Sequence, residues 1–184
     1  MKSDSSKTKQ KGDKALNIQE DIEKLQTNDP AFLESLQEEM RRATPFLNKA
    51  LDSIKKLTLK GIAELKSLLM PSEEVVGVLC ALVYLLAENI PDDYLKVDGK
   101  KGPVVKWVEC KRLLDNRALF FESVMKVGEW INEERITYEM TMPVRGYMEK
   151  SWWNEEKLRK KSMAVANNGE FVRNMIACLI CLEE

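Results

Sequence analysis

The sequence of 184 residues contains no histidine, and it has only 8 glycines and 6 prolines. Without histidine the chain lacks the side chain that most often serves as a general base or a zinc ligand. The scarcity of glycine and proline argues against an all-β chain, which needs many tight turns. The phosphate-binding patterns GxxxxGK[ST] and GxGxxG are also absent. We therefore predict a chain that is not itself an enzyme and that carries no catalytic residue, no metal site and no cofactor.

Long apolar runs and a strong net charge are lacking too. The longest apolar run, Val75 to Ala87, is too short to cross a bilayer, and the N-terminus has no apolar core of a secretory signal. The net charge of -1 gives no overall bias toward nucleic acid or membrane surfaces. We expect a soluble intracellular protein that binds neither nucleic acid nor membrane.

The four cysteines are Cys80, Cys110, Cys178 and Cys181, all among apolar neighbours. In an intracellular protein such thiols are expected to be reduced and buried. The spacing Cys178-x-x-Cys181 is that of half a zinc site, but no second pair lies nearby in sequence, so core thiols are the better interpretation.

Helical periodicity dominates what is present. From Leu33 the apolar positions alternate by three and four residues, which is typical of a coiled-coil seam. In this register Pro45 points away from the partner helix. The same pattern also fits one amphipathic helix of a globular bundle. The seam consists of Leu33, Leu36, Met40, Ala43, Leu47, Ala50, Ile54 and Leu57.

The seam ends at a short polar turn predicted from Thr58 to Lys66. A new helical pattern through Ile62, Leu65, Leu68 and Leu69 leads up to Pro71. The sequence Pro71-Ser72-Glu73-Glu74 is typical of a helix start, because acidic residues in the first turn face the positive end of the helix dipole. The helix that it opens, Glu73 to Glu88, is apolar on all sides and is predicted to form the core.

The rest of the chain is predicted as follows. Met1 to Asp13 is expected to be a disordered tail, Ala15 to Leu25 a short amphipathic helix, and Asn28-Asp29-Pro30 the start of the next helix. Asn89 to Lys106 is expected to be a loop. Helical spacing resumes over Trp107–Val127, with a break near Asp115-Asn116. Two shorter helices are predicted on either side of Pro143, at Glu129–Thr137 and Val144–Trp153. One last helix is predicted over Glu155–Cys181.

Three blocks of the sequence resemble the stalk-to-head region of dynein heavy chains. They are PFLNKALDSIKKLTLKGIAELKSLLMPSEEVVGVLCALVYLL, WVECKRLLDNRALFFESV and SMAVANNGEFVRNM, which together cover about Pro45 to Met175. The loop before Trp107 is similar to an insertion of axonemal dyneins. The sequence departs from the family pattern at Thr58-Leu59, Gly61, Ser72 and Phe171.

The resemblance implies an all-α fold, a small helical bundle head on a coiled-coil stalk. Residues 1–14 would be a tail, 15–57 one stalk strand, 58–175 the head and 176–184 the start of the returning strand. The head would bind microtubules (tubulin) with an affinity linked to the register of the stalk. The other partner would be the returning stalk helix of the same heavy chain, and the ATPase motor ring would lie outside this chain. The location implied is the cytoplasm and its cytoskeleton, or the axoneme of a cilium.

Tubulin presents an acidic surface, so we expect basic side chains on one face of the head to contact it. The candidates are Lys60, Lys66, Lys111, Arg112, Arg117, Lys157, Arg159, Lys160 and Lys161. Ordinary solvated surfaces would look the same, since charged faces are the norm. Two other functions stay open: a free-standing adaptor that binds a partner helix through its unpaired seam, and a basic bundle in which Trp152 and Trp153 stack on single-stranded nucleic acid.

Overall fold

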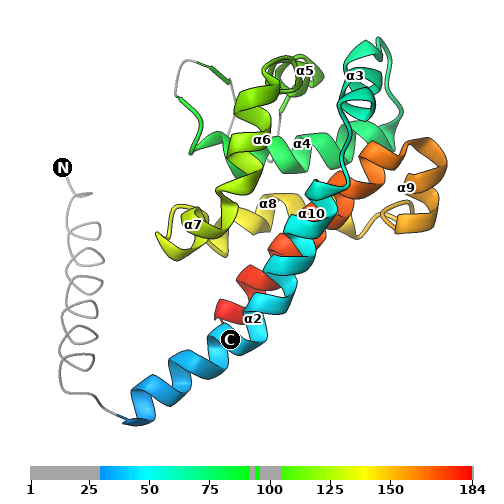
Figure 1. Ribbon diagram of the computed structural model, residues 1–184. Coiled ribbons are helices and arrows are strands. Elements are labelled where there is room, and N and C mark those ends of the chain that lie inside the picture. The colour runs from blue at the N-terminus through cyan, green and yellow to red at the C-terminus, as the bar shows by residue number, and fades with distance from the viewer. Residues whose placement is uncertain (1–29, 92–93, 96–104, 184) are drawn as a thin grey trace, which may run out of the picture. The chain divides into compact units, whose positions relative to one another are not determined.

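The structure is a computed structural model that describes residues 30–91, 94–95 and 105–183, with the side chains at 32, 33 and 36 outside the described set. All regular structure in these residues is helical, which confirms the all-α prediction (Figure 1). The predicted tail and the predicted helix Ala15–Leu25 lie outside the described residues. The elements are α2 (Pro30–Lys55), α3 (Leu59–Ser67), α4 (Glu73–Ala87), α5 (Trp107–Asp115), α6 (Arg117–Met125), α7 (Val127–Asn132), the 3-10 helix η1 (Glu139–Thr141), α8 (Met142–Met148), α9 (Glu155–Lys161) and α10 (Met163–Glu183).

The chain divides into two units, Met1–Arg41 and Arg42–Glu184. Each is described by itself. In the first unit, the described residues from Pro30 onward are helical and form the first part of α2. In the second unit, none of the described helices meets the length and apolarity that a membrane crossing requires.

The seam of α2 is buried where the helix belongs to the second unit. Ala43, Ala50, Ile54 and Leu57 are buried, and Leu47 is half-buried. Pro45 is exposed within an uninterrupted helix, as its place in the register predicts. Met40, which belongs to the first unit, is 63% exposed.

α4 is the central helix of the second unit. Ser72 occupies its N-cap position, and Glu73 and Glu74 fill its first turn, as the sequence predicts. Ten of its residues are buried, from Val75 through Leu86. Helices that are apolar on every side are stable only in the middle of a bundle, and the core prediction for this segment is confirmed.

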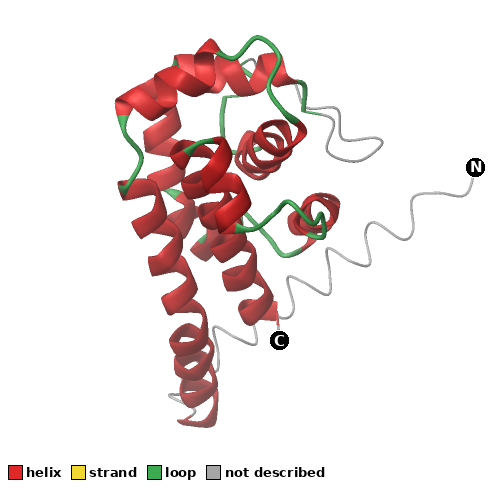
Figure 2. Ribbon diagram, turned by 90° about the vertical axis from the view of Figure 1, so that its right-hand side faces the viewer, coloured by secondary structure: helices red, strands yellow, loops and turns green. Residues whose placement is uncertain are grey.

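α10 runs beside the Arg42–Lys55 part of α2 in the opposite direction (Figures 1 and 2). The start of α10 lies against α3, because a Cβ atom added at Gly61 would be 3.1 Å from the Cβ of Ala164. Lower on α10, a Cβ at Gly169 would be 2.8 Å from Leu158 Cδ1 of α9. The two glycines thus mark the places where α3 and α9 pack closely on α10.

The helical pattern predicted through Ile62 and Leu65 is confirmed, because both residues are buried in α3, but two other predictions for the segment after α2 are wrong. The predicted turn Thr58–Lys66 is helix α3, and Thr58 caps it by accepting a hydrogen bond from the Gly61 amide at 3.0 Å. The helical pattern does not continue through Leu69, because Leu68 has an extended backbone and Leu69 is 85% exposed. The threonine cap is the physical reason for the first difference, since it satisfies the free amides of a new helix start.

The C-terminal helices also differ from the prediction. Glu155–Cys181 is not one helix, because Ser162 is extended (φ -168°, ψ 141°) and separates α9 from α10. The predicted helix Glu129–Thr137 is the shorter α7. Pro143 does not separate two helices but lies in the first turn of α8, where a proline ring is tolerated.

The break near Asp115-Asn116 and the loop before Trp107 agree with the prediction. α5 ends at Asp115, and Asn116 caps α6 by accepting a hydrogen bond from the Leu119 amide at 3.1 Å. The described residues of the segment 89–106 contain no helix, and its other residues lie outside the described set.

Candidate basic surface

The nine candidate residues lie on four helices rather than three. Arg117 is the first residue of α6, and the last four candidates lie on the separate helix α9 rather than at the start of α10. α3 and α9 both adjoin the start of α10, so these elements gather at the end of the second unit where α2 ends and α10 begins (Figure 1). The candidates are distributed as Lys60 and Lys66 on α3, Lys111 and Arg112 on α5, Arg117 on α6, and Lys157, Arg159, Lys160 and Lys161 on α9.

α3 is held by two buried side chains and by its neighbours. Ile62 and Leu65 point into the core. The indole of Trp107, at the start of α5, donates to the Leu68 carbonyl oxygen at 3.3 Å. Both ends of α3 are therefore anchored, and its basic side chains project from a fixed position.

Lys66 joins α3 to α5. Its ammonium lies 2.6 Å from a carboxylate oxygen of Asp115, the last residue of α5. The hydrogen bond from Lys66, followed by the charges of Lys66 and Lys111, lowers the pKa of Asp115 below its usual 3.8. Lys66 and Lys111 thus converge on one carboxylate, although they come from different helices.

Arg112 acts as a tether within the unit. Its guanidinium lies 3.1 Å from a carboxylate oxygen of the buried Glu109 and donates to the Tyr94 carbonyl oxygen at 3.4 Å. The Tyr94 hydroxyl donates in return to the Arg112 carbonyl oxygen at 2.9 Å. These contacts hold Tyr94 on α5 and leave the Arg112 side chain half-buried.

α9 is a short helix with one buried side chain, Leu158. Asn154 caps it by accepting a hydrogen bond from the Lys157 amide at 2.9 Å. Two glutamates in the first turn form ion pairs with cations one turn later, Glu155 with Arg159 and Glu156 with Lys160. The positive charge at this end of the helix is thus partly neutralised by the helix itself.

The other two cations of α9 contact residues outside the helix. Lys157 donates to the Ser151 carbonyl oxygen at 2.8 Å. Lys161 lies 3.6 Å from Glu74 at the start of α4. The pKa of Glu74 is lowered first by the Ser72 hydroxyl and less by Lys161. Lys161 therefore contributes a weak link between α9 and α4.

Four candidates make no ion pair within the described residues, three of them on α3, α5 and α6 and the fourth, Lys157, on α9. Lys60 and Arg117 are exposed, and Lys111 is half-buried beside Asp115. Lys60 lies on α3, Lys111 on α5 and Arg117 on α6. Three of the four cations without an ion pair thus lie on the α3–α5–α6 side of the basic surface, and one lies on α9.

An exposed apolar pair follows the C-terminal end of α3 and was missed in the sequence. Leu69 is 85% exposed and Met70 is 95% exposed in the connection from α3 to α4. Leu59, beside Lys60, is exposed as well. A signal was present, because a residue just before a Pro-Ser-Glu-Glu start is disfavoured in a helix. Leu69 and Met70 could have been assigned to the loop on that ground.

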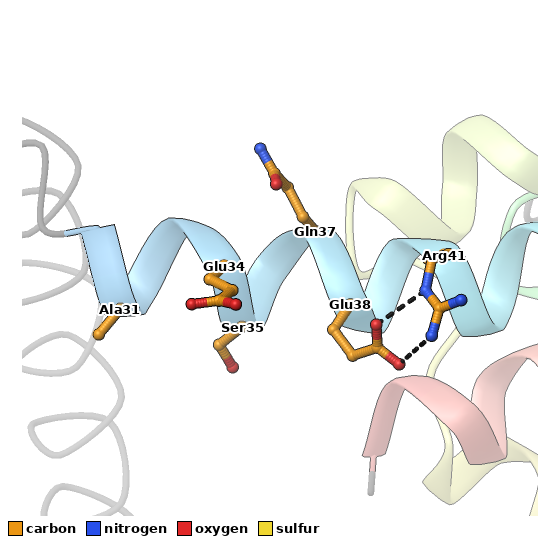
Figure 3. A pocket seen from close by; sticks show the side chains of 6 residues that line it. All are labelled: Ala31, Glu34, Ser35, Gln37, Glu38 and Arg41. Atoms are coloured by element: carbon orange, nitrogen blue, oxygen red, sulfur yellow. Dashed lines mark hydrogen bonds and ion pairs between the residues drawn. The ribbon is translucent and has the colours of Figure 1, made fainter.

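Two hollows of the described surface are lined by none of the basic candidates. One, of about 480 Å³, is lined by residues of a single helix, α2, among them Glu38 and Arg41, whose side chains share two hydrogen bonds of 2.8 Å (Figure 3). Another, of about 410 Å³, lies between Glu88 and Met140. The described residues contain no group of three or more potential metal ligands.

Trp152 and Trp153 do not form an exposed stacking platform. Their rings are stacked on each other with centroids 5.8 Å apart, and Trp153 is buried. Trp152 packs on α4, since a Cβ at Gly77 would be 2.4 Å from its ring. This packing makes Trp153 part of the core and places Trp152 against it, so the pair does not offer two free ring faces for stacking on bases.

The chain is distantly similar to the dynein alpha chain of the flagellar outer arm of Chlamydomonas reinhardtii. The two are 28% identical over 142 residues, which is 77% of this chain and 3% of the relative. The chain thus spans a small fraction of the length of that protein. No protein-family model matches the sequence.

Proposed function

We propose that this chain is a microtubule-binding head of the dynein type. The observation that carries the proposal is the similarity to a flagellar dynein chain, which extends over 77% of this chain. The convergence of Lys66 and Lys111 on Asp115, and the packing of α3 and α9 against α10, support it. The head would bind tubulin directly, without ATP, and the motor ring of such heavy chains would lie outside this chain.

The surface that contacts tubulin would be led by Lys60, Lys66, Lys111 and Arg117. They lie on α3, α5 and α6, and three of them make no ion pair within the described residues. The cations of α9 would contribute less, because Glu155 and Glu156 already balance two of them. Arg112 would act mainly as a tether of Tyr94.

Leu69 and Met70 would add an apolar contact to the same surface. They are among the most exposed large apolar residues of the described chain and follow α3 directly. Exposed apolar side chains rimmed by charged ones are typical of protein interaction sites. Electrostatic attraction would orient the head, and the apolar pair would contribute burial once docked.

The stalk would be built from α2 and the end of α10. Under this proposal residues 15–57 form one strand, 58–175 the head and 176–184 the start of the returning strand. The antiparallel course of α2 and α10 supports it (Figures 1 and 2). A heptad seam can pair in two registers, so a half-heptad slide of one helix could transmit a signal to α3, which follows α2 directly. The location would be the cytoskeleton, in the cytoplasm or the axoneme of a cilium.

Co-sedimentation with microtubules tests the proposal. The purified chain should pellet with microtubules at low salt and less at high salt, because salt screens exposed charges. Lys111→Glu and Arg117→Glu should each weaken binding by about threefold to tenfold, corresponding to ~1 kcal/mol of surface electrostatics. The double reversal Lys160→Glu with Lys161→Glu should also weaken pelleting.

The control variant is Lys49→Glu, which reverses an exposed cation of α2 away from the α3 end. It should pellet like the unmodified chain, and circular dichroism should show equal helicity in all variants. A folded chain that does not pellet at low salt contradicts the proposal. Equal pelleting of the Lys111→Glu and Lys49→Glu chains would instead show that the binding face is misplaced.

A second candidate function is an adaptor that binds a partner helix through the α2 seam. The exposure of Met40 favours it, but the seam from Ala43 to Leu57 is already buried within the second unit. Such an adaptor would use only the first turns of α2. Failure to pellet, together with capture of an isolated amphipathic helix that Met40→Glu abolishes, would support this function instead.

A further inference from the structure

The thiols of Cys80 and Cys110 face each other across two helices. Cys80 lies in the middle of α4 and Cys110 in α5, and their sulfur atoms are 3.7 Å apart. Both residues are buried and neither is part of a disulfide. We propose that they form a redox-active dithiol, a site at which a small peroxide reversibly joins α4 to α5 by a disulfide. This inference is independent of the proposed binding function.

The geometry favours a bond between these two sulfurs. A disulfide has an S–S distance of about 2.05 Å, so the sulfurs must approach by roughly 1.7 Å. Side-chain rotation with a small shift of α5 can supply that distance. The two residues are 30 positions apart in sequence, so their proximity results from the packing of α4 against α5 and not from local chain geometry.

The environment distinguishes the two thiols. A hydrogen bond from Cys110 lowers the pKa of Cys80, whereas the hydrogen bond with Cys80 and burial raise the pKa of Cys110. Cys80 is therefore the thiol that ionises first. Its sulfur also lies 3.0 Å from the Val105 carbonyl oxygen, an acceptor for the thiol hydrogen before ionisation. The thiolate is the nucleophile in thiol oxidation, so Cys80 attacks and Cys110 resolves.

The reaction balances with hydrogen peroxide as the oxidant. The Cys80 thiolate attacks one peroxide oxygen, the O–O bond breaks, and the departing hydroxide takes up a proton to form water. Cys80 is now a sulfenic acid. The Cys110 sulfur then attacks the Cys80 sulfur, the S–O bond breaks, and the Cys110 proton leaves with the hydroxyl group as a second water. Two thiols are oxidised to one disulfide, and one peroxide is reduced to two waters.

Cys178 and Cys181 provide an internal comparison. They lie one turn apart on α10, and Cys178 is buried while Cys181 is half-buried. Burial raises the pKa of Cys178 to about 11, which disfavours its thiolate. If exposure alone decided reactivity, Cys181 would be oxidised before the buried pair. The proposal predicts the opposite order.

The test uses the full chain and hydrogen peroxide. The reduced protein is treated with graded peroxide, free thiols are alkylated in denaturant, and the digest is mapped by mass spectrometry. We expect a linked peptide that joins Cys80 to Cys110 and lacks two hydrogens, with Cys178 and Cys181 still alkylated. Dithiothreitol should restore all four thiols. The oxidised chain should melt about 5–10 °C higher than the reduced chain, because a disulfide restricts the unfolded state.

Matched variants separate the dithiol from general oxidation. Cys80→Ser and Cys110→Ser should each abolish the linked peptide and the melting shift, whereas Cys178→Ser should retain both. The unmodified chain decides the outcome even if a serine variant fails to fold. The proposal is overturned if Cys181 is oxidised while Cys80 and Cys110 remain thiols, or if the two form links only between molecules.

Discussion

The α3–α5 side of the basic surface and helix α9 are alike in composition but differ in how their charges are arranged. On α9, two of the four cations pair with glutamates one turn earlier in the same helix. On the other side, Lys66 pairs with Asp115 of a different helix, and Lys60 makes no ion pair within the described residues. Equal numbers of basic residues therefore present different amounts of free charge to a partner.

The two regions also differ in their anchoring. α3 buries two side chains, Ile62 and Leu65, and is tied to α5 at its end. α9 buries one, Leu158, which lies against Gly169 of α10. Hydrophobic burial is the main source of helix stability in proteins. The stability of α9 therefore depends on a single buried side chain, whereas that of α3 depends on two. We therefore predict that α9 is the least stable helix of the basic surface.

Leu158→Ala should have the largest effect. Truncating a fully buried leucine costs about 2–5 kcal/mol, and no other buried side chain of α9 can compensate. We expect a loss of ~3 kcal/mol in the free energy of unfolding, measured by urea denaturation. Leu158→Met preserves the volume and should cost less than ~1.5 kcal/mol. A loss below ~1 kcal/mol for the alanine variant would show that α9 is not held through Leu158.

Gly169→Ala and Gly61→Ala compare the two close approaches to α10. The new Cβ at position 169 would lie 2.8 Å from Leu158 Cδ1, while that at 61 would lie 3.1 Å from Ala164 Cβ. Overpacking costs about 1–3 kcal/mol, and alanine regains ~1 kcal/mol of helix propensity. We expect Gly169→Ala to destabilise the chain by ~1 kcal/mol and Gly61→Ala to be nearly neutral in urea denaturation. The reverse order would contradict the tighter packing at α9.

Thr58→Ala and Asn154→Ala remove the two N-caps. Each side chain accepts a hydrogen bond from a backbone amide of the first turn, at 3.0 Å in α3 and 2.9 Å in α9. A lost cap costs ~1 kcal/mol. Amide hydrogen exchange should show faster opening of α9 than of α3, because α9 has less burial to hold it. Thr58→Ser and Asn154→Asp keep the acceptor oxygen and serve as controls. Equal amide exchange rates in the alanine variants and in these controls would show that the two side chains do not stabilise the helix starts.

Lys66→Gln should have the smallest effect, and its signature is a pKa. In the folded chain the pKa of Asp115 lies below its usual 3.8 because of Lys66. A depressed carboxyl pKa contributes stability above the unfolded pKa, and that stability is lost as the pH falls through the folded value. The variant should raise the Asp115 pKa toward 3.8 in an NMR titration and reduce the acid sensitivity of the melting temperature below pH 4. Lys160→Gln, which breaks a pair within α9, should leave Asp115 unchanged.

Much of the fold could be predicted because its signals are local. The start of α4 after Ser72 and the break at Asn116 follow from capping and turn residues. The end of α3 and the break at Ser162 were missed. In both places the residue pattern of the helix continues in the sequence, but the backbone is extended, at Leu68 after α3 and at Ser162 after α9. The change of direction allows the next helix to pack on the core.

The basic candidates were chosen from the sequence, but their side-chain contacts could not be predicted from it. The nine basic residues are visible in the sequence, and the pairs within α9 follow from their spacing of four residues. The inward role of Arg112 and the pairing of Lys66 with Asp115 involve residues distant along the chain. Such contacts depend on how the helices pack, and no local pattern encodes them.

The sequence by itself determined the helical class, the core helix α4 and the face of α2 that is buried from Ala43 to Leu57, because the spacing of apolar residues sets which face of each helix must leave water. The tertiary structure alone decided which cations remain free and which thiols meet. The ion pair of Lys66 with Asp115 requires that α3 packs against α5, and the contact of Cys80 with Cys110 requires that α4 packs against α5. Contacts between side chains on separate helices follow from that packing, and free charge and thiol reactivity depend on those contacts.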